Sequence, residues 1–548
     1  MDSSHDQKRM NVEDNRLSSL PDGLIHKILS FISIKHAIQT SVLSSRWRFL
    51  WTSMPYLNFS RDDFSKLPKF SKFVTHVLSD RNNQTEVSSV KISLHGKMSG
   101  IFAKKIIKYA FSHNIQQLNV ASVLANEVGF PLVLFSSRSL KHLSLTMKVL
   151  SDIDTTLHTS PYTIYFSTFR HIEYRSKYSL RYVFNATSTW ELPALTTLYL
   201  DNAALICDEN TDKCIDLFSK CANLKNLTLK SCYMEGFKGL SICLPKLSNL
   251  TIEIACGSVD VFNIVAPQLK NLTIRSYFDK QYSLSAPDLV FLFYQGGYCL
   301  QLSTDDYLSL EKADICVLRP KDAHQVLRML QRLHNVKFLT LNVEIVELLS
   351  SSVELITNQP SPFANLKSLK IQPDIDFSDL GEHERADMSA EVRSYLLDGS
   401  PDATFTTVSR EDVRAIKNTK LAQNLITELS ALLEQEKASI ETKMAKLHEH
   451  GKAHVDTDMS WKYLSVLIQE GEKKTSDIIS KLKEINGILT ELPASNRATV
   501  QPSFSTLGVE ANIVANKITG FIKMVCDENQ RCLNVCIDDV TTASQLSS

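Results

Sequence analysis

Residues 224–229 read LKNLTL, residues 247–252 read LSNLTI, and residues 269–274 read LKNLTI. In each stretch the first, fourth and sixth positions are apolar and the positions between them are polar. This alternation predicts a short strand with one buried face. Because one such strand cannot bury its apolar side alone, we expect the three stretches to pack side by side.

The same spacing recurs between residues 87 and 371. The twelve units are Val87-Val90-Ile92, Ile115-Leu118-Val120, Leu140-Leu143-Leu145, Phe169-Ile172-Tyr174, Leu195-Leu198-Leu200, Leu224-Leu227-Leu229, Leu247-Leu250-Ile252, Leu269-Leu272-Ile274, Leu289-Leu292-Tyr294, Leu310-Ala313-Ile315, Val336-Leu339-Leu341 and Leu366-Leu369-Ile371. Their first positions fall 20 to 30 residues apart, which is the period of leucine-rich repeats. The alternative is a set of ordinary amphipathic strands in a β-rich globular domain.

Prolines precede several units and predict a turn that feeds each strand. They are Pro193, Pro245, Pro267 and Pro287. Regular leucine-rich repeats place Asn or Cys after the strand, and here only the unit at Leu224 does so, with Cys232. We therefore expect an irregular solenoid whose convex-side segments vary from repeat to repeat.

Residues between the apolar positions of a strand point away from its buried face. In four units these residues are Thr197-Tyr199-Asp201, Asn226-Thr228-Lys230, Asn249-Thr251-Glu253 and Asn271-Thr273-Arg275. Stacked strands would turn them into a column of Asn, a column of Thr and Tyr, and a column of alternating charge. Because solenoids present extended concave faces to partners, we predict a target-binding surface there. Its candidate residues are Tyr199, Asp201, Lys230, Glu253 and Arg275, and the alternative is a solvated sheet face.

Residues 15–59 show a helical pattern instead. Leu24, Ile28 and Phe31 recur at helical spacing, and Pro21 suits the first turn of a helix because its missing N–H would be unpaired there. A second helix is expected near His36, and a third is expected around residues 46–51. Three helices this short carry more apolar surface than they can bury among themselves. They therefore either cap the remaining chain or dock onto a partner.

This stretch resembles an F-box, in particular its plant form. The matching elements are Leu20-Pro21-Asp22, Ile28-Leu29-Ser30-Phe31, Thr40-Ser41-Val42-Leu43-Ser44, Arg46-Trp47-Arg48 and Leu50-Trp51. The chain departs from the family at Ser33-Ile34-Lys35-His36, where a proline and an acidic residue are usual. The resemblance implies docking onto the Skp adaptor of a cullin-based ubiquitin ligase. On that basis the expected adaptor-binding residues are Leu20, Pro21, Ile25, Ile28, Leu29, Val42, Leu43, Trp47 and Leu50, although Trp47 can equally belong to the core of the F-box.

The composition changes after residue 408. From Glu411 to about Leu492 the chain is rich in Glu, Lys, Leu and Ile, and it predicts two helices. A Ser/Thr-rich link is expected from Ala494 to Leu507, followed by a last helix. The broken heptad pattern favours a bundle within one chain over a long parallel coiled coil. The predicted fold is thus α/β, with a disordered N-terminus at 1–14, an F-box at 15–60, a leucine-rich-repeat solenoid at 61–408 and a helical C-terminal region at 409–548.

Charge, apolar runs and cysteine spacing exclude some classes of partner and indicate a compartment. Lys plus Arg and Asp plus Glu both number 60, which argues against a nucleic-acid partner. No apolar run approaches the roughly 20 residues of a membrane-spanning helix, so no membrane partner is expected. The 11 Cys form no CxxC pair, as expected of reduced thiols in the nucleus or cytoplasm.

No sequence motif of a phosphate-binding loop or a nucleophile elbow is present. His448, His450 and His454 form a cluster in which His450 and His454 are one helical turn apart, a spacing that can share a metal. The cluster lacks the order of a zinc-protease motif, and a charged helix end explains it better. We therefore expect no enzyme activity, no metal and no cofactor.

The resemblance implies a function without bond chemistry. The chain would be the substrate-recognition subunit of a Skp–cullin–F-box ubiquitin ligase, with the adaptor on the F-box and a target protein on the repeats. Two alternatives stay open. The chain is a non-catalytic interaction scaffold whose helices only cap the repeats, or it is a small-molecule receptor that uses the repeat surface without ligase assembly.

Overall fold

The computed structural model describes residues 20–545 with gaps. The gaps are residue 65 and residues 96–100, 124–127, 130–135, 149–181, 186–188, 258, 277–278, 304–306, 358, 374–387 and 451–456. The predicted disordered segment 1–14 and the predicted repeat unit at Phe169 lie outside the described residues. The chain forms two compact units, of which the first extends to Thr407 and the second begins at Val408.

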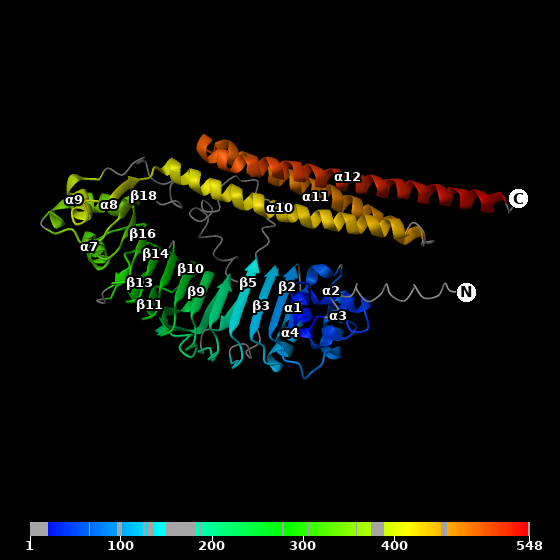
Figure 1. Cartoon of the computed structure of the whole chain (residues 1–548), viewed down its shortest axis with the longest axis horizontal. Helices are drawn as coiled ribbons and strands as arrows, with labels where there is room; N and C mark the ends of the chain where they lie inside the picture. Colours follow the sequence, from blue (N-terminus) through cyan, green and yellow to red (C-terminus); the bar gives the residue numbers. More distant parts are fainter. Residues whose placement is uncertain are drawn as a thin grey trace, which may run out of the picture. The chain divides into compact units, whose positions relative to one another are not determined.

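The first unit is built on a parallel sheet whose main row of strands follows the order of the chain (Figure 1). The strands of this row are β1 (Tyr56–Ser60), β2 (Ser89–His95), β3 (Gln117–Val123), β5 (His142–Lys148), β7 (Thr197–Asp201), β9 (Asn226–Cys243), β10 (Asn249–Gly257), β12 (Asn271–Ser276), β14 (Phe291–Gly296), β16 (Lys312–Val317), β17 (Phe338–Asn342), β18 (Ser368–Gln372) and β19 (Thr404–Thr407). Every predicted unit in the described residues supplies one of these strands. The strand β5 pairs directly with β7.

In the middle of the main row, the segments that link successive strands along the sequence form a second row of parallel strands. It consists of β4 (Val128–Gly129), β6 (Tyr182–Asn185), β8 (Ala203–Ile215), the end of β9, β11 (Val261–Val265), β13 (Gln281–Ser285) and β15 (Gln301–Leu302). The long strand β9 belongs to both rows, because Asn226–Lys230 pair with β7 and β10 while Gly239–Cys243 pair with β11.

Helices replace the second row toward both ends of the sheet. They are α3 (Leu67–Asp80) and α4 (Ile101–Ser112) near the start, and α7 (Ala323–Arg332), α8 (Val343–Ser350) and α9 (Ala390–Leu397) near the end. Short 3₁₀ turns occur at Arg61–Asp63 and Val353–Leu355. The segments that link the strands of the main row are therefore helical at its ends and extended in its middle.

The register between neighbouring strands explains how the leucines of successive repeats are buried. Leu227 stands opposite Leu198 and Leu250, and Leu272 stands on the far side of Leu250. All four side chains are buried in one continuous core. At each of the four prolines the backbone makes the predicted turn, as where the N–H of Leu247 donates to the carbonyl of Leu244 across Pro245.

The N-terminal module differs from the expected three helices. It contains α1 (Asp22–Leu29) and α2 (Ile34–Gln39), but the predicted third helix is replaced by 3₁₀ turns at Thr40–Val42 and Leu50–Ser53. The module ends in β1, whose alternating burial matches its sequence, Tyr-Leu-Asn-Phe-Ser. The residues of this strand, which the sequence predicts as part of the F-box, also form the first strand of the sheet by pairing with β2.

The second unit contains three long helices, α10 (Arg410–His450), α11 (Thr457–Glu491) and α12 (Ala494–Gln545). Lys474 pairs with Glu436 at 2.5 Å and Lys481 with Glu428 at 3.6 Å, so α11 runs antiparallel to α10. A contact between Lys517 and Glu441 at 2.6 Å joins α12 to α10. An apolar core separate from that of the sheet holds the three helices together.

The predicted link from Ala494 to Leu507 is wrong, because α12 begins at Ala494. The Ser and Thr residues of this segment favour turns, and Pro502 lies inside the helix. Val500 and Leu507 are nevertheless buried against the other helices. Tertiary packing thus outweighs local helix propensity here.

Replacement of Leu250 by Ala should lower the free energy of unfolding of the first unit by about 2–5 kcal/mol, because it leaves a cavity between two neighbouring leucines. Urea titration followed by circular dichroism measures this loss. Thr251→Ala is the matched control, since the adjacent side chain faces away from the core, and its effect should stay below about 1 kcal/mol. Equal losses in the two variants would contradict the assignment of the buried face.

Candidate functional site

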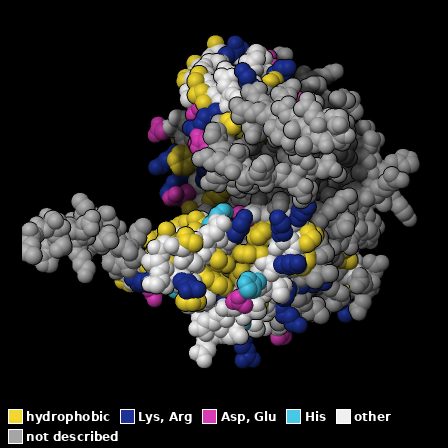
Figure 2. Space-filling view, turned by 90° about the vertical axis from the view of Figure 1, so that its right-hand side faces the viewer, with side chains coloured by type: hydrophobic (Ala, Val, Ile, Leu, Met, Phe, Trp, Pro, Cys, Tyr) yellow, Lys and Arg dark blue, Asp and Glu magenta, His cyan; other side chains and the backbone are white. Residues whose placement is uncertain are grey.

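The end of the first unit that is formed by the N-terminal helices carries exposed apolar side chains with Lys and Arg around them (Figure 2). The exposed apolar residues of this module are Leu24, Ile28, Phe31, Ile32, Val42, Leu43 and Phe49. Val42 is 87% exposed and Phe31 is 78% exposed. We call this set the apolar face. Contiguous exposed apolar surface of this kind marks interaction sites in soluble proteins.

The nine predicted adaptor-binding residues divide between this face and the interior. Pro21, Ile28, Val42 and Leu43 are exposed, and Leu20 is half-buried. The other four are buried in the core of the module; they are Ile25, Leu29, Trp47 and Leu50. Burial corrects the expected place of Ile25, Leu29 and Leu50 on a contact surface, whereas a core position was one of the two expected for Trp47. Leu24, Phe31 and Phe49 were missed, although Leu24 and Phe31 lie on the same predicted helical stripe as Ile28.

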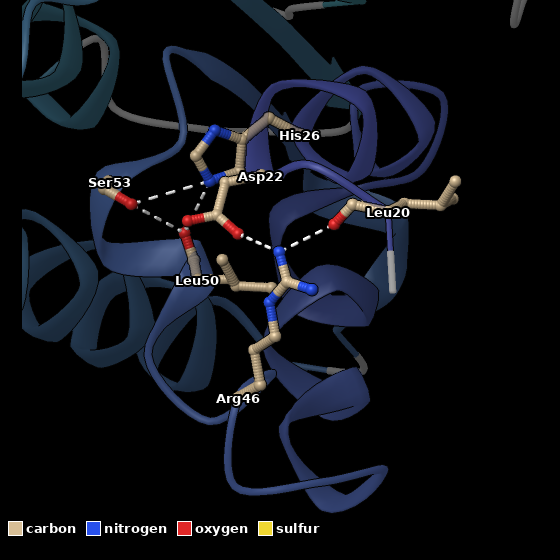
Figure 3. A network of polar contacts seen from close by, with 6 residues as sticks. All are labelled: Leu20, Asp22, His26, Arg46, Leu50 and Ser53. Atoms are coloured by element: carbon tan, nitrogen blue, oxygen red, sulfur yellow. Dashed lines mark hydrogen bonds and ion pairs between the residues drawn. The ribbon is translucent and has the colours of Figure 1, made fainter. Parts of the chain in front are cut away.

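Polar contacts fix the shape of the module that carries the apolar face (Figure 3). The Arg46 guanidinium donates to the carbonyl of Leu20 at 2.6 Å and to the carboxylate of Asp22 at 2.5 Å. The Nε2 atom of His26 lies 3.1 Å from the carbonyl of Leu50. These contacts tie the start of α1 to the turns that follow α2, so the Arg46-Trp47 segment holds its position without a third helix.

A buried arginine joins the module to the sheet. The Arg81 side chain, which follows α3, donates to the carbonyl of Met54 at 2.6 Å and to that of Trp51 at 3.2 Å. Burial lowers the pKa of this guanidinium, and contact with Tyr109 opposes that effect. Trp51 is half-buried and packs against the shared core. The module and the first repeats are therefore one packed body.

On the sheet, the four predicted units stand in the expected register. Thr197, Asn226, Asn249 and Asn271 occupy successive positions across β7, β9, β10 and β12. The amide of Asn249 donates to the side-chain oxygen of Asn226 at 2.6 Å, and the amide of Asn271 donates to that of Asn249 at 2.7 Å. These Asn side chains form a hydrogen-bonded ladder across the face of the sheet.

The charged column is also in register. Asp201, Lys230, Glu253 and Arg275 occupy one row, and Arg275 pairs with Glu253 at 3.9 Å. Tyr199 donates from its hydroxyl to Asp201 at 3.3 Å, and its pKa is raised by burial and by the nearby carboxylate of Asp201. Lys230 is exposed, and the other four candidate target-binding residues are half-buried. The structure thus brings all five together on one face.

Sequence analysis missed the continuation of this face. Phe291, Phe293 and Phe338 occupy outward positions on β14 and β17, and Lys312 and Asp314 lie between them on β16. The outward Phe residues of the FLFY sequence at 291–294 were a signal, because that strand has apolar residues on both faces.

Within the described residues, no three or more His, Cys, Asp or Glu side chains are arranged to hold a metal ion. The side chains of His448, His450 and His454 lie outside the described part of the chain. None of the helices described here is both long and apolar enough to cross a membrane.

Trp47 and Val42 provide a test of which side chains are structural. Trp47→Ala should lower the free energy of unfolding by about 3–5 kcal/mol, because the indole is buried in the core. Val42→Asp should change it by no more than about 0.5 kcal/mol, because the side chain is exposed. Urea titrations of both variants measure the difference, and a large loss for Val42→Asp would show that the apolar face is packed in solution.

Asp314 should make stability depend on pH. Burial raises the pKa of its carboxyl, and Lys312, Lys370 and Arg275 only partly offset this effect. Since the folded pKa exceeds the unfolded value of about 4, the wild-type protein loses stability as pH rises through that range. Asp314→Asn removes this loss, so urea titration should show a stabilising effect at pH 7 that shrinks at pH 4. A larger benefit at pH 4 would contradict the assigned sign.

Comparison with known proteins identifies the N-terminal module. Residues 17–59 match the F-box domain family. A putative F-box/FBD/LRR-repeat protein of Arabidopsis thaliana is 26% identical over 373 residues, which cover 65% of this chain and 68% of the relative. A putative F-box/LRR-repeat protein of the same plant is 27% identical over 364 residues, covering 65% of each chain. A further F-box/FBD/LRR-repeat protein is 26% identical over 410 residues, covering 72% of this chain and 74% of the relative. The chain therefore carries an F-box domain and is similar, along most of its length, to plant F-box proteins with leucine-rich repeats.

Proposed function

We propose that this chain is the substrate-recognition subunit of a Skp–cullin–F-box ubiquitin ligase. In this proposal the F-box binds the Skp adaptor and, through it, a cullin. The leucine-rich repeats form a solenoid whose strand face binds a target protein. The chain carries out no bond chemistry, and it acts by raising the effective concentration of the target near the ubiquitin carrier.

The apolar face of the F-box is the observation that carries the proposal. Phe31, Val42 and Leu43 are exposed, although the module has its own packed core and is joined to the sheet. A helical module that served only as a cap would have no need of apolar side chains on the side away from the sheet. An adaptor surface of matching apolar character would cover them.

The strand face supports the second half of the proposal. Tyr199, Asp201, Lys230, Glu253 and Arg275 present hydrogen-bonding and charged groups in fixed register. Repeat proteins bind partners through such extended faces. The proposal places the protein in the nucleus, the cytoplasm or both, and it involves no cofactor.

The scaffold alternative has one supporting observation. The strand β1 covers the edge of β2, so the module does cap the sheet. A truncation that begins at Arg61 would remove β1 and expose that edge. Such a truncation cannot separate a cap from a docking module, whereas substitutions confined to the apolar face can.

Co-purification of the full chain with a Skp adaptor tests the proposal. The wild-type chain should retain the adaptor, and the double variant Val42→Asp, Leu43→Asp should retain at least about tenfold less, because charges replace apolar contact area. Circular dichroism melts should show that the variant stays folded.

Leu308→Asp is the matched control, since Leu308 is 69% exposed and Leu43 is 62% exposed. Leu308 lies outside the F-box, so this variant should bind like wild type. Absence of adaptor binding by the wild-type chain, or full binding by the double variant, would refute the docking role.

A further inference from the structure

Three phenylalanines and three cations gather on the strand face at Arg275, the last member of the charged column, and on the strands that follow it. Phe291, Lys312 and Phe338 occupy one row across β14, β16 and β17. Phe293 and Asp314 occupy the adjacent row, which continues through β17 to Lys370 on β18. Arg275 lies beside Phe293 on β12. We call the set Phe291, Phe293, Phe338, Arg275, Lys312 and Lys370 the aromatic–basic patch.

Contacts within the aromatic–basic patch hold its side chains in place. The Arg275 guanidinium lies 5.3 Å from the ring centre of Phe293, and the Lys312 ammonium lies 5.7 Å from that of Phe291. These are cation–π distances. Phe338 is 46% exposed on the other side of Lys312. The patch therefore offers ordered aromatic surface next to positive charge, a combination enriched at binding hot spots.

The charge balance of this region is positive. Glu253 pairs with Arg275, and at the start of the neighbouring strands Glu311 pairs with Lys337 at 2.7 Å. Lys312, Lys367 and Lys370 form no ion pair with any described residue. The carboxyl group of Asp314 is half-buried between Phe293 and Thr340, and Lys312 and Lys370 lie near enough to lower its pKa. A ligand with negative charge would complement the cations that surround this single carboxyl group.

We propose that the aromatic–basic patch binds an acidic segment of a partner protein that carries an aromatic or large aliphatic side chain. The apolar side chain of the segment packs on Phe293 and Phe338, and its carboxylates face Lys312 and Lys370. This site rests on the proposed function, because it assigns a chemistry to the target. Nucleic acid fits less well, because the chain has equal numbers of basic and acidic residues and so lacks the basic footprint of a nucleic-acid-binding protein.

Fluorescence anisotropy with a defined peptide tests the proposal on the full chain. The probe is a labelled heptapeptide with three acidic residues on each side of one phenylalanine. It should bind at least about tenfold more tightly than the same peptide with a central alanine, and than a peptide with lysines in place of the acids. Its affinity should fall with added salt, because exposed charges are screened.

Matched variants assign the binding to the patch. The double variant Phe293→Ser, Lys370→Glu should weaken binding of the acidic peptide at least tenfold. The control Tyr56→Ser, Lys91→Glu makes the same kinds of change on outward positions of β1 and β2, outside the patch and outside the predicted target-binding residues, and it should bind like wild type. Thermal melts exclude unfolding of either variant.

Equal affinity of the three peptides, or equal loss in the two double variants, would overturn the proposal. A labelled oligouridine that binds more tightly than the acidic peptide, and is lost in the patch variant, would assign the patch to nucleic acid instead. Co-purification with the Skp adaptor should be unchanged in the patch variant, and peptide binding should be unchanged in the Val42→Asp, Leu43→Asp variant. Failure of the adaptor-docking proposal can therefore be distinguished from failure of the peptide-binding proposal.

Discussion

The leucines of successive parallel strands stand opposite one another, and the rest of the first unit depends on that alignment. Leu198, Leu227, Leu250 and Leu272 bury one another only in this register. A shift by one residue would move every apolar side chain to the outer face. The same alignment decides what the outer face displays, because the residues between the leucines are then brought into columns. The Asn ladder, the charged column and the aromatic–basic patch are all consequences of how the core packs.

Alternating sequence was sufficient to predict a strand for every repeat unit in the described residues, and to predict the outward residues of β7, β9, β10 and β12, because a strand has a side-chain period of two. The pairing of Glu253 with Arg275 follows from that rule once Leu250 and Leu272 are aligned. The second row of strands could not be predicted in the same way. Segments such as Val261–Val265 are five residues long, and alternation over so short a stretch also fits a loop that feeds the next repeat. Which linking segments become helices depends on the packing of neighbouring repeats, and no single repeat contains that information.

The F-box shows a different limit of prediction from the sequence. Its apolar residues were recognised as a set, but apolar character does not separate a side chain that fills the core from one that faces a partner. Trp47 is buried while Phe49, two residues later, is exposed. The segment forms turns instead of the expected third helix, and its contacts with the rest of the module decide which of its apolar side chains are buried. The Ala494–Leu507 segment shows the reverse case, in which packing in the second unit makes a helix of residues that favour turns.

The strand β1 has a geometric consequence for the whole first unit. Since the F-box ends in a strand that pairs with β2, the distance from the F-box to any strand of the main row is set by the number of strands between them. Eight pairing steps lead from β1 to β14 through β2, β3, β5, β7, β9, β10 and β12. With a spacing of about 4.8 Å between strands, this path is roughly 38 Å long. The number of strands therefore sets the distance along the sheet between the F-box and a binding site. Gain or loss of one repeat would move a partner bound beyond that repeat by one strand spacing relative to the F-box.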